Sequence, residues 1–389
     1  MTDHTRPSRF SRRGLLQGGL AVGAVSVNGA GAAHAAAPDP TARRGRHRPA
    51  GDTEVVLLGV GGGPTYLPGA ECEGISSALK VGDRYYLVDA GHGVLQRLRQ
   101  AELGNWAVPN GGPLDALRAV FVTHLHSDHI VDLNNLFVSG VFNGLQFTDR
   151  PVRLIGPGNR GTLPPVFGGG PRGPVVAPEN PTPGTVETWE LLKRCFATDY
   201  NDRIADNRIE GPDELVEAQD IELPTRLTAD PNGSNVPDMD PVLIYEDDRV
   251  SVSCILVQHA PVFPAFAYRF ETEAGSVVFS GDTSRTPNIV KLASQADVLV
   301  HEVISRQWLD QEMPEPRSAQ VQAGYQHLLG AHTAAEEVGK VAEEAGVRRL
   351  VLNHLVPMNW PVQRWRQTVS PDFSGELFVG QDLMRIPVA

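Results

Sequence analysis

The stretch Thr123-His124-Leu125-His126-Ser127-Asp128-His129 places four potential metal ligands within six residues. It directly follows the apolar run 119–122, which predicts a buried strand. The first two histidines are two residues apart, so on an extended segment both imidazoles point to the same side and can hold one metal ion. Asp128 and His129 follow where the chain leaves the strand, so they point elsewhere and can hold a second ion.

This segment cannot complete a catalytic site alone, because a catalytic metal needs about three protein ligands and an open position. Three more candidate ligands each follow an apolar run that predicts a strand, namely His259 after 254–257, Asp282 after 277–280 and His354 after 350–352. We therefore expect these side chains to complete the site from other strand ends.

The order of predicted elements indicates the fold class. Two series of short strands, each followed by helical patterns, predict an α/β protein with two sheets face to face and helices outside, a four-layer αββα sandwich. The domain is expected over residues 52–389. Residues 156–245 have weak periodicity and many prolines and acidic residues, so they are expected to form an irregular insertion.

The His-x-His-x-Asp-His motif formed by His124, His126, Asp128 and His129 resembles that of the metallo-β-lactamase fold superfamily. The resemblance covers about residues 55–155 and 250–354. Further stretches are similar to the ribonuclease Z and arylsulfatase-like branch: Leu58 to Pro64, Leu87 to Gly91, Gly281 to Thr283, Val300 to Glu302 and His332 to Glu336.

The resemblance implies two sets of metal ligands. One ion would bind His124, His126, His259 and Asp282. The other would bind Asp128, His129, His354 and the same Asp282, which would bridge the two ions, and Asp89 would be a buried acid nearby. Imidazole and carboxylate ligands without thiolate suit Zn²⁺ first, and Mn²⁺ or iron next. Two such ions would hold a bridging hydroxide, which Asp128 would orient or deprotonate.

Two residues outside the ligand set are candidates for contact with the substrate. In the ribonuclease Z branch the histidine that matches His332 assists phosphodiester cleavage, paired with an acid, and Glu302 is the candidate for that acid. Thr333 and Glu336 also fit a capping box, which would place His332 at a partly positive helix N-terminus. The alternative is a simple helix cap with a solvated histidine.

The N-terminus predicts export. Residues 1–35 combine arginines, a weakly apolar stretch and a small-residue cleavage pattern ending near Ala35, and the stretch Ser11 to Gln17 resembles a twin-arginine signal peptide. Residues 36–51 have the composition of a flexible linker. The expected location is therefore periplasmic or secreted, with the twin-arginine machinery as a partner; a disordered basic tail is the alternative.

The charge of the chain bears on the substrate. Without residues 1–35 the chain holds 30 basic and 45 acidic residues, and residues 151–245 hold 8 and 15. A ribonuclease Z would present a basic arm to tRNA, so no nucleic-acid partner is expected. Four aromatic residues could line a pocket for a small ester, or simply pack in the core: Phe263, Phe266, Trp308 and Trp360.

The sequence thus predicts an exported, dinuclear metal-dependent hydrolase of a small anionic ester, either a phosphodiester or an aryl sulfate ester. A lactone or β-lactam hydrolase, a non-enzymatic metal-binding protein and a ribonuclease Z-like RNA endonuclease are the alternatives. The sequence leaves the substrate, the native metal and formation of a homo-oligomer open.

Overall fold

The computed structural model describes residues 52–106, 111–225 and 227–389. The expected signal peptide and linker, residues 1–51, lie outside the described residues. Within the described part of the chain no helix is both long and apolar enough to cross a membrane.

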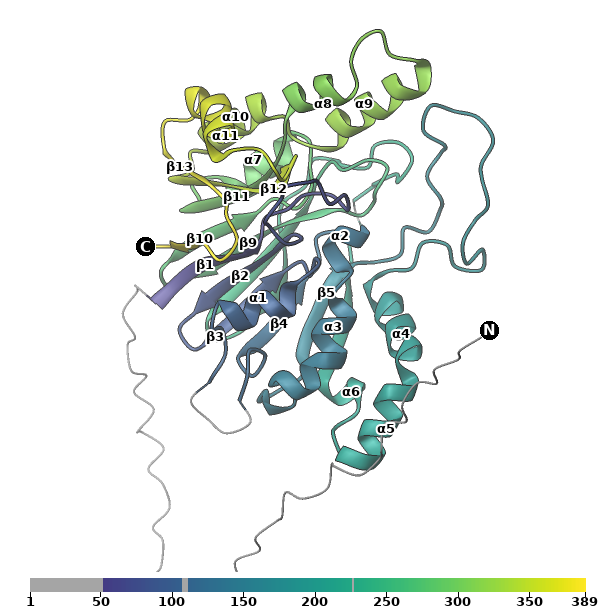
Figure 1. The fold of residues 1–389 in the computed structure, drawn as a ribbon, viewed down its shortest axis with the longest axis vertical. Helices are drawn as coiled ribbons and strands as arrows, with labels where there is room; N and C mark the ends of the chain where they lie inside the picture. Colours follow the sequence, from purple (N-terminus) through teal and green to yellow (C-terminus); the bar gives the residue numbers. More distant parts are fainter. Residues whose placement is uncertain (1–51, 107–110, 226) are drawn as a thin grey trace, which may run out of the picture. The chain divides into compact units, whose positions relative to one another are not determined.

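Two seven-stranded sheets carry the fold, and apart from β14 their neighbouring strands are consecutive in the chain (Figure 1). The first has the order β14-β1-β2-β3-β4-β5-β6 and the second the order β13-β12-β11-β10-β9-β8-β7. The strands of the first sheet are β1 (Thr53–Gly59), β2 (Ser76–Val81), β3 (Arg84–Val88), β4 (Leu117–Phe121), β5 (Val152–Pro157), β6 (Val216–Ile221) and β14 (Arg385–Pro387). Those of the second are β7 (Val242–Glu246), β8 (Val250–Leu256), β9 (Phe266–Thr272), β10 (Gly275–Phe279), β11 (Val298–Ile304), β12 (Arg349–Val356) and β13 (Glu376–Val379).

Both sheets share one pattern of pairing. In the first sheet, neighbouring strands are antiparallel in the part β14-β1-β2-β3 and parallel in the part β3-β4-β5-β6. In the second sheet, they are antiparallel in the part β7-β8-β9-β10 and parallel in the part β10-β11-β12-β13. Parallel strands need long crossover connections, which here are mostly helical. The carboxyl ends of the parallel strands therefore meet at one edge of each sheet, where ligand sites of α/β proteins form.

Helices cover the outer faces of both sheets (Figure 1). On the first sheet α1 contacts β1, and α4 contacts β5 and β6; on the second, α7 contacts β8 and β9, α10 contacts β11 and α11 contacts β13. The helices are α1 (Val94–Gln100), α2 (Ser127–Ile130), α3 (Leu133–Val138), α4 (Thr185–Cys195), α5 (Ala197–Asn207), α6 (Pro212–Leu215), α7 (Pro287–Ala293), α8 (Arg306–Glu312), α9 (Ala319–Ala331), α10 (Ala335–Ala345) and α11 (Val362–Val369). The predicted four-layer αββα fold is confirmed.

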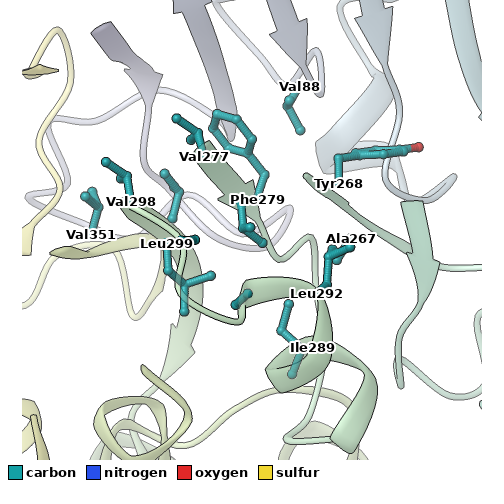
Figure 2. Packing of buried hydrophobic residues seen from close by; sticks show 14 of the residues in the cluster. Val88, Ala267, Tyr268, Val277, Phe279, Ile289, Leu292, Val298, Leu299 and Val351 are labelled. Carbon is teal, nitrogen blue, oxygen red and sulfur yellow. The ribbon is translucent and has the colours of Figure 1, made fainter. Parts of the chain in front are cut away.

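Side chains of the central strands alternate between two hydrophobic cores. Val55 and Leu57 of β1 lie in the core that includes the second sheet, whereas Val56 and Leu58 pack with the helices outside the first sheet. Figure 2 shows the first of these cores, where Phe279 of β10 lies near Val88 of β3. This core fixes the two sheets that hold the site.

The segment expected to be an irregular insertion, residues 156–245, contains regular elements. It holds α4, α5, α6 and β6, and near its end β7 begins. β6 and β7 are the edge strands of the first and second sheet. The irregular part is the loop of residues 158–184 between β5 and α4, which projects from the sheets at the right of Figure 1.

The aromatic cluster between the sheets provides a test of the packing. Phe270 is fully buried and meets the rings of Tyr86, Phe121 and Phe279. Phe270→Ala is expected to lower the free energy of unfolding by about 3–5 kcal/mol, because it removes buried apolar surface and leaves a cavity. Leu243→Ala, at a residue 57% exposed on β7, should change it by about 0.5 kcal/mol or less. Chemical denaturation measures both, and equal effects would contradict this packing.

Candidate metal centre

The seven predicted ligands come from four segments and converge. His124 follows β4, His126 precedes α2, and Asp128 and His129 lie within α2. The remaining three lie just beyond strands or within one: His259 after β8, Asp282 after β10 and His354 in β12. Both sheets therefore contribute side chains to one cluster.

The first group consists of His124, His126 and His259, whose ligand atoms lie within 4.8 Å of one another. His126 Nδ1 is 3.2 Å from His259 Nε2. Asp282 Oδ2 lies 3.8 Å from His124 Nε2 and 3.7 Å from His259 Nε2. These separations allow one ion to touch all four side chains, at the bond lengths of about 2.0–2.2 Å that zinc prefers.

The second group contains Asp128, His129, His354 and again Asp282. Asp282 Oδ2 is 3.3 Å from Nε2 of both His129 and His354. Asp128 Oδ2 is 3.5 Å from His129 Nε2 and 3.4 Å from His354 Nε2. Asp282 is thus shared by both groups, and the buried histidine–aspartate cluster fits a dinuclear metal site.

Hydrogen bonds on the far side of the imidazoles orient them as ligands. His129 donates Nδ1–H to Asp89 Oδ2 at 2.8 Å, and His259 donates Nδ1–H to the Ala331 carbonyl at 2.9 Å. His124 Nδ1 is 3.1 Å from Thr123 Oγ1. The Nε2 atoms of His124 and His129 are buried and have no hydrogen-bond partner among the described residues. Such an arrangement is typical of metal ligands, whose other nitrogen is bound by the protein.

Burial also favours neutral imidazoles on one side of the site. Burial lowers the pKa of His259 to about 3, and it lowers the pKa of His124 well below its usual value. Only a neutral imidazole can bind a metal, so these two histidines need not lose a proton at neutral pH. The donor set therefore suits divalent cations.

Asp89 holds the segment that carries the histidines. Its carboxylate is buried and accepts hydrogen bonds from Thr123 N at 2.8 Å and Thr123 Oγ1 at 2.9 Å, in addition to the bond from His129. Its backbone has a φ of 63°, a left-handed conformation that costs energy for a residue with a side chain. Asp89 thus ties the end of β3 to the loop after β4.

His332 and Glu302 form the pair that the sequence suggested. His332 Nδ1 lies 3.1 Å from Glu302 Oε1 and 3.9 Å from Asp282 Oδ2. The same Glu302 oxygen accepts hydrogen bonds from the amides of Thr283 and Thr333, at 3.0 and 3.1 Å. Burial lowers the pKa of His332, but the Glu302 carboxylate outweighs it and raises this pKa to about 9.

The predicted capping box at Thr333 is wrong. α10 begins at Ala335, and its N-cap, Ala334, makes no side-chain hydrogen bond. The Thr333 hydroxyl instead donates to the Thr283 carbonyl at 2.6 Å, because the loop after Asp282 lies beside it. His332 is the C-cap residue of α9, so the Glu302 carboxylate orients it rather than a helix dipole.

Two features of the site were not recognised from the sequence. The Gly63 amide donates to Asp128 Oδ2 at 3.1 Å, and a Cβ on Gly62 would lie 2.7 Å from His354 Nδ1. Asp382, far along the chain, accepts hydrogen bonds from Val60 N at 3.1 Å and Glu73 N at 2.8 Å and so holds this glycine loop. The run of glycines in the sequence could have indicated the loop that contacts Asp128 and His354. No sequence pattern indicated the role of Asp382.

The four predicted pocket aromatics separate in the structure. Phe263 lines a cavity beside His126. Phe266 is fully buried in the core between the sheets, and Trp360 packs against the ring of Trp365. Trp308 packs on the small apolar cluster around Leu309. Phe263 thus lies in a pocket at the site.

Comparisons with known proteins agree with the fold and the site. A family model for the metallo-beta-lactamase superfamily matches residues 72–145. Ribonuclease Z of Mycobacterium bovis (strain BCG / Pasteur 1173P2) is 30% identical over 86% of this chain and 98% of that protein. Ribonuclease Z of Mycobacterium sp. (strain KMS) is 33% identical over 86% of this chain and 96% of that protein. The structure of human tRNase Z, short form, has a TM-score of 0.52 and 17% identity over 86% of this chain and 99% of that one.

Two layered sheets with a histidine–aspartate centre between their strand ends define a metal-dependent hydrolase of the metallo-β-lactamase fold. The chain belongs to the metallo-β-lactamase superfamily, in its ribonuclease Z-like branch. The family, the fold and the enzyme class predicted from the sequence are confirmed.

The hydrogen bond from His129 to Asp89 predicts how strongly metal is held. Asp89→Asn is expected to weaken metal affinity about 10- to 100-fold, because the amide cannot accept all three hydrogen bonds that orient His129 and its loop. Competition with a coloured chelator measures the affinity without any substrate. Asp206→Asn, an exposed position on α5, is the matched control. Equal affinities in the two variants would contradict the role of Asp89.

Proposed function

We propose that the protein is a phosphodiesterase and that RNA is its first candidate substrate. The observation that carries the proposal is the His332–Glu302 pair, held beside the shared Asp282 of the metal centre. Relatives matched over nearly their whole length bear the name ribonuclease Z, which supports RNA over the small aryl ester that the charge suggested. Sulfate esters, lactones and β-lactams have no comparable support.

The side chains around the centre suit a phosphodiester. Divalent ions, when bound, would supply a Lewis acid and an activated water nucleophile. His332 is 12% exposed, and the Glu302 carboxylate at 3.1 Å favours its imidazolium form, which can donate a proton to the leaving oxygen. Glu302 fixes its Nδ1 side, which leaves Nε2 to face the substrate. Asp128, at the edge of the centre, can accept a proton from the attacking water.

A small phosphodiester is the second candidate, and a specific observation favours it. Residues 151–245 carry 15 acidic against 8 basic residues, which disfavours a long polyanion. A single phosphodiester group with short organic arms would meet far less repulsion. Both candidates share the same chemistry at the metal centre.

One panel of substrates tests the proposal on the purified, metal-loaded protein. We expect cleavage of an RNA substrate such as a tRNA precursor, of bis(4-nitrophenyl) phosphate, or of both. Measured metal content shows that the sample is loaded. Turnover of a 4-nitrophenyl sulfate, a lactone or a chromogenic cephalosporin, without cleavage of either phosphodiester, would overturn it.

The role of His332 predicts a dependence on the leaving group. His332→Ala is expected to lower kcat about 10²- to 10⁴-fold for an RNA phosphodiester, whose alkoxide leaving group needs a proton. For bis(4-nitrophenyl) phosphate the loss should be much smaller, because nitrophenolate leaves without protonation. His327→Ala on α9, outside the metal groups, is the control. Equal losses on both substrates, or loss of bound metal, would contradict a proton-donor role.

Export is a separate proposal, supported by the twin-arginine-like stretch of residues 11–17. A protein with Arg12→Lys and Arg13→Lys is expected to stay in the cytoplasm, because the export machinery reads this pair. Cell fractionation followed by immunoblotting measures the distribution. An unchanged distribution would refute the proposal. If export holds, the physiological substrate is a phosphodiester met outside the cytoplasm, which favours the small-diester candidate.

A further inference from the structure

A cavity of about 420 Å³ lies beside the metal centre. Its walls come from three segments, which are residues 125–130, the region 157–188 and the loop 261–264. Six of the lining residues are prolines: Pro157, Pro164, Pro181, Pro183, Pro261 and Pro264. The volume lies within the range of about 300–1,000 Å³ typical of sites for small molecules.

The walls are apolar and preformed. Proline rings fix the backbone φ, so a wall built from prolines loses little conformational entropy when a ligand binds. Val262 and Phe263 add aliphatic and aromatic surface, and none of the described residues that line the cavity is acidic. Such a surface favours an uncharged ring over a phosphate or a sugar.

Arg160 is the one arginine or lysine among the described lining residues. Its guanidinium donates to neutral oxygens, Pro231 O at 2.9 Å and Asn232 Oδ1 at 2.8 Å. These bonds and a further one to the Thr162 carbonyl hold the guanidinium in place, and the charge of the Asp230 carboxylate also acts on it. A planar guanidinium held in this way can stack on the face of an aromatic ring.

His126 belongs both to the cavity wall and to the first ligand group of the metal centre. This side chain lines the cavity, and its Nδ1 is 3.2 Å from Nε2 of His259 in the first ligand group. Pro261 and Val262 follow His259 in the chain by two and three residues. A ligand with its anionic group at the metal centre can therefore extend an organic arm into the cavity.

We propose that this proline-walled cavity is a subsite for one arm of the ester, and that it selects a planar, uncharged aromatic ring such as a nucleobase or an aryl group. The proposal rests on the proposed phosphodiesterase function, since that function places the anionic group at the metal centre. Affinity for the ring then comes from apolar contact and stacking rather than from a basic surface. This explains how an acidic protein can bind a nucleotide-like substrate.

Calorimetric binding to the metal-loaded protein tests the subsite without any turnover. The ligands are phenyl phosphate and methyl phosphate, which share the anionic group and differ in the ring. We expect the native protein to bind phenyl phosphate at least about tenfold more tightly. Val262→Trp, which fills the cavity, should reduce this ratio to less than about twofold and leave the Kd of methyl phosphate unchanged.

Two more variants keep the outcome clear. Thr188→Trp fills the same cavity from α4 and should give the same result, so a folding defect in one variant does not decide the matter. Val176→Trp makes the same change as Val262→Trp at a residue that is 87% exposed, and should keep the native ratio. A native ratio near one, or a ratio that survives both cavity variants, would overturn the subsite. If the ratio behaves as expected while no phosphodiester is cleaved, the proposed function fails and the subsite stands.

Discussion

The site depends on one buried carboxylate that four imidazoles approach at once. The side chain of Asp282 is 3% exposed, and its Oδ2 lies within 3.3–3.8 Å of Nε2 of His124, His129, His259 and His354. Burying an ionised carboxylate costs several kcal/mol unless positive charge compensates it. Burial keeps His124 and His259 neutral, so positive charge on the imidazoles is favoured at His129 and His332, whose pKa values the nearby carboxylates raise. Divalent ions held by this cluster would supply the compensating charge directly.

This requirement constrains the scaffold around it. The carboxylate follows Gly281, whose φ of +56° and lack of a side chain permit a close approach to the Phe266 carbonyl; a Cβ there would lie 2.7 Å from that oxygen. Thr283, the next residue after the carboxylate, is held by Glu302, which also holds His332. The carboxylates of Asp282 and Glu302 thus connect the candidate metal ligands, the loop after β10 and the candidate proton donor His332. The closely packed core between the sheets holds the strands that carry these side chains in fixed positions.

Much of this arrangement could be predicted from the sequence, for an identifiable reason. The central strands are buried on both faces, so they appear as apolar runs, and their ends carry the ligands. The edge strand β6 was missed because it is half-exposed and largely polar, with the sequence VEAQDI over Val216–Ile221. The edge strand β7 has the mostly apolar sequence VLIYE, but it is short and half-exposed and lies at the end of a segment rich in proline and acidic residues. The role of Asp382 was equally invisible, since its partners Val60 and Glu73 are more than 300 residues away. The hydroxyl of Thr333 donates to the carbonyl of Thr283, a residue distant in the sequence, instead of capping the helix that follows it. A local sequence pattern cannot predict such a tertiary hydrogen bond.

Under the proposed function, charge and cavity together would limit the shape of the substrate. At physiological ionic strength charges interact over about 8 Å, so the acidic surface of residues 151–245 repels only those phosphates that lie close to it. A long RNA would bring many phosphates there, whereas one diester at the metal centre, with its ring among the prolines, would bring few. Binding energy for such a ligand would then come mainly from the metal ions and apolar contact, neither of which needs a basic surface. An RNA end or a short nucleotide diester satisfies both constraints, and an extended duplex satisfies neither.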